Sequence, residues 1–314
     1  MLSSSRSRLI VLAVGAAMLA VGLAAVALPD GNPSDDGENE ADDTPSVAAD
    51  DPDTADTERF ARAREVRVAL TDPAFSARDD AGLLRLLLAE AVIGSDRDAD
   101  RVLAQITEVA DRLEATAAEF DALADETRAS PSDGTEPPLE GLEALHDQAV
   151  DVAAHLRTAA DPAAIHGSAA LELHGAADRF ASAEVRGPDD DDPDVLADGW
   201  TTDLERLRAY EAAATTAADH PPLVAHAEAH LEVVTALIDL SETAIAHLDD
   251  GDLDAYNAVL EQRLGDVDPL VEELVPSLEQ SLQATVSDAE AAEGRVLGLL
   301  SELEGLRTST PPPS

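Results

Sequence analysis

The chain has 314 residues, of which 66 are aspartate or glutamate and 20 are basic; all 20 are arginine, and the formal net charge is −46. So acidic a surface excludes ordinary nucleic-acid binding, because contacts with the phosphate backbone need lysine and arginine. Since cysteine is absent, disulfides, thiolate chemistry and a lipid-modified cysteine are excluded as well.

This charge predicts a protein made for a salt-rich medium. Crowded carboxylates repel one another and destabilise a compact fold. At molar salt the Debye length shrinks to about 3 Å, so most of that repulsion is screened. We therefore expect the chain to come from a halophilic archaeon.

The first 28 residues predict a membrane anchor. Residues 1–8 contain Arg6 and Arg8, and residues 9–28 form an uncharged apolar run, which is long enough to cross a hydrocarbon core. The positive-inside rule places residues 1–8 in the cytoplasm and the rest of the chain outside the cell. The alternative is a cleaved signal sequence, with cleavage near Ala27 and secretion of the remainder. The length of the apolar run favours the anchor.

Residues 29–56 predict an acidic, disordered tether, because they hold eleven acidic residues and no basic one. Beyond it, residues 57–307 predict an all-α extracellular domain rich in alanine and leucine, both strong helix formers. A Pro-rich tail, 308–314, ends the chain.

Short turns between long amphipathic segments predict an antiparallel bundle of about 7–9 helices. A boundary between two sub-bundles near 187–194 stays open. The expected helices are 57–70, 79–93, 98–128, 139–160, 162–184, 195–218, 223–248, 253–264 and a last one from 268 that bends at Pro276.

Residues 223–248 carry the clearest helical pattern, with apolar residues at alternating steps of three and four that are typical of a coiled-coil seam. We expect Leu231, Val234 and Ile238 at the centre of the seam. On the same helical wheel His226 and His230 flank the seam.

Histidine is the first candidate for chemistry. His226 and His230 are one turn apart, and together with His166 they could ligate a transition metal. The segment lacks the H-E-x-x-H pattern of zinc proteases, since Glu228 points away from His226. The preferred interpretation is therefore histidines hydrogen-bonded at the edge of the core, with no metal and no cofactor. A second candidate, for calcium, is the set Asp194, Asp198, Gly199 and Glu205, which matches an EF-hand loop only in part.

These features predict a non-catalytic protein held in the bilayer by residues 9–28. Its plan resembles the external part of helical-bundle sensory transducers, without a shared motif. We expect an envelope scaffold or an accessory sensory module that works with a helical protein partner in the membrane or envelope. The alternative is a metal- or solute-binding bundle that uses His166, His226 and His230.

Overall fold

The computed structural model describes residues 54–94, 98–128, 142–182 and 192–308. These residues are nearly all helical and include no strand, which confirms the all-α prediction for this part of the chain. No helix within these ranges is long and apolar enough to cross a membrane. The predicted anchor at 9–28, the tail beyond 308 and most of the tether lie outside the described residues. The first described helix begins at Thr54, inside the range 29–56 that was predicted as a tether.

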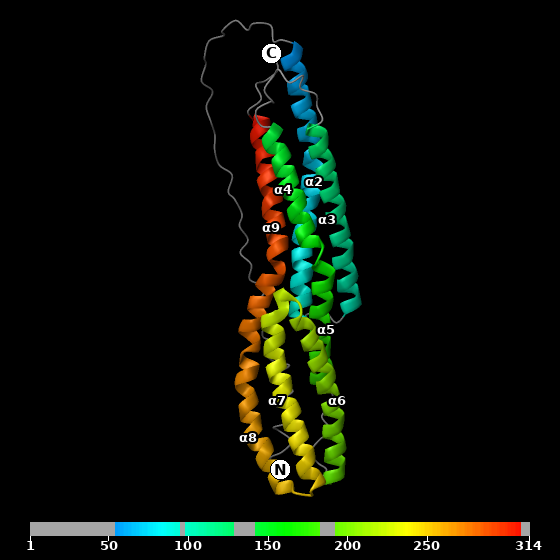
Figure 1. Ribbon diagram of the computed structural model, residues 1–314, viewed down its shortest axis with the longest axis vertical. Coiled ribbons are helices and arrows are strands. Elements are labelled where there is room, and N and C mark those ends of the chain that lie inside the picture. The colour runs from blue at the N-terminus through cyan, green and yellow to red at the C-terminus, as the bar shows by residue number, and fades with distance from the viewer. Residues whose placement is uncertain (1–53, 95–97, 129–141, 183–191, 309–314) are drawn as a thin grey trace, which may run out of the picture.

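The helices form two bundles stacked end to end (Figure 1). The first bundle consists of α2 (Thr54–Ile93), α3 (Ala99–Arg128), α4 (Leu142–Ala160) and α9 (Leu274–Thr308). The second consists of α5 (Ala163–Ala181), α6 (Pro193–Ala218), α7 (Val224–Asp249) and α8 (Leu253–Glu272), with a short 3₁₀ turn, η1 (Pro221–Leu223), before α7. Helix α5 also packs against α2 and α3, and α7 packs against α9. We call the region of these contacts the joint.

The chain crosses the joint twice. It passes from α4 into α5 at Asp161 and Pro162, where proline disfavours a helical conformation of the preceding residue. It returns from α8 into α9 at Glu273, three residues before Pro276 in the first turn of α9. The predicted break between 264 and 268 was wrong, because α8 continues to Glu272 with Pro269 inside it.

Pro73 does not divide two helices, contrary to the prediction that separated 57–70 from 79–93. Helix α2 runs continuously through it. A proline removes one helical hydrogen bond, but Pro73 is itself buried, and Leu70, Ala74 and Ala77 on both sides of it are buried in the core. Packing of this face stabilises the helix across the proline.

One apolar core runs through both bundles and is made largely of alanine, leucine and valine. Tyr210 and Phe120 are its largest fully buried side chains. A second, small cluster lies toward the far end of the second bundle and contains Ala244, Leu248 and Tyr256. There Trp200 packs against the cluster, and its Nε1 donates a hydrogen bond of 3.0 Å to the Tyr256 hydroxyl.

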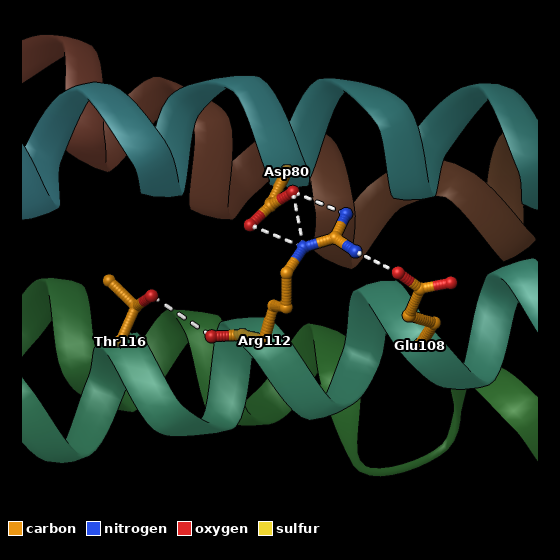
Figure 2. A network of polar contacts seen from close by, with 4 residues as sticks. All are labelled: Asp80, Glu108, Arg112 and Thr116. Carbon is orange, nitrogen blue, oxygen red and sulfur yellow. Dashed lines mark hydrogen bonds and ion pairs between the residues drawn. The ribbon is translucent and has the colours of Figure 1, made fainter.

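Arginine links neighbouring helices across the acidic surface. Figure 2 shows Arg112 of α3 between Asp80 of α2 and Glu108 of its own helix. Arg112 Nε and Nη2 donate to Asp80 at 3.0 and 2.7 Å, and Nη1 donates to Glu108 at 3.0 Å. The hydrogen bond with Asp80 raises the pKa of Arg112. Such a bidentate pair is the most specific ion pair available to a carboxylate.

The buried face of α7 is rotated from the predicted seam. Val234 is fully buried as predicted, whereas Leu231 and Ile238 are only partly buried. The centre of the face passes instead through His226, His230, Val233, Leu237 and Leu240. Contacts with α6, α8 and α9 bury a face wider than one coiled-coil seam. The prediction that the two histidines flank the core was therefore wrong.

Candidate functional site

A cluster of buried histidines lies at the joint. His226 is 3% exposed and His230 is fully buried in the first two turns of α7, and His174 of α5 is 4% exposed beside them. The ring centroid of His174 lies 5.4 Å from that of His226 and 6.1 Å from that of His230. The ring centroids of His226 and His230 are 4.3 Å apart. We call these three residues, with Tyr210 of α6 and Ser277 of α9, the histidine cluster.

A chain of hydrogen bonds runs through four members of the cluster. Ser277 Oγ donates to the Leu274 carbonyl at 2.9 Å and lies 3.1 Å from His226 Nδ1. The Nε2 atoms of His226 and His230 face each other at 2.9 Å. Tyr210 closes the chain through a short contact between its hydroxyl and His230 Nδ1.

This chain has one polarity if both imidazoles are neutral. The single hydroxyl proton of Ser277 goes to Leu274, so the Ser277 oxygen accepts a proton from His226 Nδ1. His226 Nε2 is then bare and accepts from His230 Nε2. His230 Nδ1 is bare in turn and accepts from the Tyr210 hydroxyl. Every donor in the chain thus has an acceptor.

Burial keeps the imidazoles neutral. It lowers the pKa of His174 to about 4, with a weaker opposing effect from the Val92 backbone. It lowers the pKa of His226 to about 3, and the nearby His174 adds to this effect. Burial also lowers the pKa of His230 well below its ordinary value. The pKa of the Tyr210 phenol is raised, first by burial and then by Asp178, so the phenol keeps its proton.

His174 is the exception in this network. Both of its ring nitrogens are buried, and neither makes a hydrogen bond of normal geometry in the described part of the chain, where the Val92 backbone acts only weakly on the ring. Leaving a buried polar group without a partner costs about 1–3 kcal/mol. Unsatisfied groups of this kind are rare in native proteins and require an explanation.

The end of α2 closes over His174. Gly94 has a φ of +65°, and a Cβ built on it would lie 2.7 Å from His174 Cγ. Two reasons therefore favour glycine at this position: its backbone is left-handed, and the imidazole fills the space that a Cβ would occupy.

Replacing Gly94 by alanine should destabilise the protein more than the same change at Gly251. Gly251 has a similar φ of +71° but open space around it, so both variants share a left-handed penalty of about 1–2 kcal/mol. Only Gly94→Ala adds overpacking against His174, of about 1–3 kcal/mol. Urea unfolding at high salt measures the difference, and equal losses would show that α2 does not press on His174.

His166 does not join the cluster. It lies two turns before His174 on α5, about 12 Å along the helix axis, and its ring makes an edge contact with His220 at 5.7 Å. Burial, followed by the effect of His220, lowers the pKa of His166, and Asp288 opposes this.

The calcium candidate is not a loop. Asp194, Asp198, Gly199 and Glu205 all lie on α6, so they spread around a helix and cannot wrap one ion. Asp192 instead caps that helix, with its side chain accepting from the Asp194 backbone N–H at 3.0 Å. Within the described ranges, no group of three or more histidine, aspartate or glutamate side chains is placed so that it could hold a metal ion as it stands.

His174 could have been found from the sequence by counting small residues as core. Ala163, Gly167, Ala170, His174 and Ala177 follow one another at steps of four and three, and all five are buried. The metal site predicted from the sequence used His166 of the same helix instead.

Comparison with protein-family models, with curated proteins and with solved structures finds no match to this chain. The function proposed below therefore depends on the geometry of the joint.

Proposed function

We propose that this chain is a non-catalytic accessory sensory module of the cell envelope, and that the joint between its two bundles is the element that responds. One observation carries the proposal: the histidine cluster is polar, buried and incompletely hydrogen-bonded at the place where the bundles meet. A rod that only had to keep its shape would be more stable with apolar side chains there, because unsatisfied polar groups destabilise a core.

The cluster draws its members from helices of both bundles. His174, Tyr210 and the two α7 histidines belong to the second bundle, while Ser277 and the end of α2 belong to the first. A change in the contacts among these side chains would therefore change the position of one bundle relative to the other. Rigid-body shifts of packed helices are a common way to transmit such a change.

Helix α2 also offers a surface on which a partner could detect that change. Val68, Phe75, Leu83 and Leu86 are 66, 46, 42 and 55% exposed, and helical spacing places them on its outward face. Exposed Asp72 and Asp79 lie on the same face between these apolar side chains, and Asp79 pairs with Arg78 at 2.7 Å. By charge complementarity, the partner we propose is a helical membrane or envelope protein with an apolar stripe flanked by arginine.

Distance measurements between spin labels test whether the joint has more than one arrangement. The chain has no cysteine, so labels can be placed by Ala118→Cys on α3 and Thr235→Cys on α7, both exposed. In the full chain at high salt, Tyr210→Phe should shift or broaden the distance between the labels by at least about 1–2 Å, the scale of helix shifts in switching proteins.

The matched control is Tyr256→Phe, which also removes one tyrosine hydrogen bond but at the far cluster. It should leave the distance between the labels unchanged. If Tyr210→Phe and Tyr256→Phe both give the wild-type distribution, the joint is rigid and the sensory proposal fails.

A further inference from the structure

We infer that the histidine cluster binds one late first-row transition-metal ion, such as Zn²⁺, through His174, His226 and His230. This inference rests on the proposed function in that it names the ligand to which the same joint responds. It differs from the site expected from the sequence, because His174 takes the place of His166.

The first argument is the orientation of His226 and His230. The Nδ1 of His226 is hydrogen-bonded to Ser277, and the Nδ1 of His230 is hydrogen-bonded to Tyr210. Their Nε2 atoms are thereby turned toward each other, 2.9 Å apart. Metal-binding histidines are commonly oriented by a hydrogen bond to the other ring nitrogen in this way.

The second argument is distance. Two imidazole nitrogens on one zinc ion, each about 2.0–2.1 Å from it, lie about 3.3 Å apart in tetrahedral geometry. The two Nε2 atoms therefore need to separate by only about 0.4 Å to admit the ion. Three rings that share one tetrahedral ion have centroids about 5 Å apart, and the observed 4.3, 5.4 and 6.1 Å lie around that value.

The third argument is the unpartnered His174. Its ring already lies against both other rings, and turning one nitrogen toward them gives up no hydrogen bond of normal geometry, only the weak interaction of the ring with the Val92 backbone. Metal binding would thus satisfy a buried nitrogen that otherwise destabilises the fold. This turn of His174, with the separation of the Nε2 pair, is the rearrangement by which the three ligands come to surround one position.

Binding also moves one proton within the cluster. The ion replaces the hydrogen bond between the two Nε2 atoms, so the proton on His230 Nε2 moves to His230 Nδ1. The Tyr210 hydroxyl, formerly the donor to Nδ1, then accepts from it. His226 already has a bare Nε2, and its Nδ1 continues to donate to Ser277. All three imidazoles stay neutral, as imidazole ligands of zinc must be.

The test is a metal titration of the full chain at high salt. Wild-type protein is freed of metal with EDTA, given excess Zn²⁺ and then dialysed against metal-free buffer, after which it should retain one equivalent of Zn²⁺. Its Co²⁺ form should show the intense visible absorption of a tetrahedral site. Nitrogen NMR of the imidazoles should show shifts at both Nε2 atoms of the α7 pair and at one nitrogen of His174.

Two variants and a control locate the ion. His174→Phe should abolish stoichiometric binding, and Tyr210→Phe, which removes the orienting group, should weaken it by about 10–100-fold. The double variant His166→Phe, His220→Phe removes the other histidine pair near the joint and should bind as the wild type does. The wild-type NMR titration decides the question even if His174→Phe fails to fold.

Three results would overturn the inference. The wild type could bind no stoichiometric metal, or binding could be lost only in the His166 and His220 double variant. The third result is that added metal shifts the nitrogen resonances of other imidazoles but not those of His174. The spin-label distances separate this inference from the proposed function. Stoichiometric Zn²⁺ with unchanged label distances would keep the metal site and reject the sensory role. Label distances that change in Tyr210→Phe, in a protein that binds no metal, would keep the sensory role and reject the metal site.

Discussion

At about 3 M salt and with EDTA present, the free energy of unfolding should fall steeply as the pH drops below the ordinary histidine pKa of about 6.5. In the folded chain burial lowers the pKa to about 4 for His174 and to about 3 for His226, and it lowers the pKa of His230 well below its ordinary value. Between pH 6.5 and 4 the unfolded chain therefore binds more protons than the folded chain. Stability is complete above pH 6.5 and is lost as the pH falls from 6.5 toward 4.

The expected slope is about half of its limit at pH 6.5 and approaches three protons, or about 4 kcal/mol per pH unit, near pH 5. Urea unfolding followed by circular dichroism at pH 7.5, 6.5, 5.5 and 5.0 measures it. His174→Phe should reduce the slope by about one proton, whereas Tyr256→Phe, at the far cluster, should leave it unchanged. Equal stability at pH 7.5 and 5.0 would mean that the cluster is hydrated or already protonated in the folded chain.

Lowering the salt concentration should unfold the helices of residues 54–308 at neutral pH. In the full chain of 314 residues, 46 acidic residues would remain unbalanced even if every arginine were paired with one acid. The Debye length grows from about 3 Å at 1 M salt to about 30 Å at 0.01 M, so each carboxylate then repels many others. We expect cooperative loss of helix below roughly 1 M salt.

Circular dichroism along a salt series from 3 M to 10 mM measures this loss. Sucrose is the matched control, because it strengthens burial by exclusion from the surface but does not screen charge. At low salt, acidification toward pH 4 should restore part of the helix by neutralising carboxylates, which is opposite in sign to the effect of acid at 3 M salt. Equal helicity at both ends of the series, or full rescue by sucrose, would refute the screening explanation.

Most helices could be predicted from local sequence signals. Ala99–Arg128 and Leu142–Ala160 match their predicted ranges closely because glycine, proline and serine mark their ends and their apolar residues repeat regularly. The errors came where tertiary packing overrode a local signal. Pro73 lies within a helix because the residues before and after it on the same face are buried in the core. Helix α8 likewise continues through Pro269, and the chain turns only at Glu273.

The site could be predicted only in part, because burial depends on the neighbours of a helix. The sequence places His226 and His230 one turn apart, but its apolar pattern puts them at the edge of the core. Only the contacts of α7 with α6 and α9 place them inside it. The approach of His174 on α5 depends on how two bundles stack, and no local pattern encodes that arrangement.

Unfolding of the far end of the second bundle can be followed separately from that of the other helices. The chain has one tryptophan, Trp200, and it packs in the small cluster with Tyr256. Its fluorescence therefore reports on that tip alone, whereas circular dichroism averages over both bundles. Two transition curves that separate along the urea axis would reveal a tip that melts independently, and coincident curves would show that cooperativity extends through the joint over the full length of the rod.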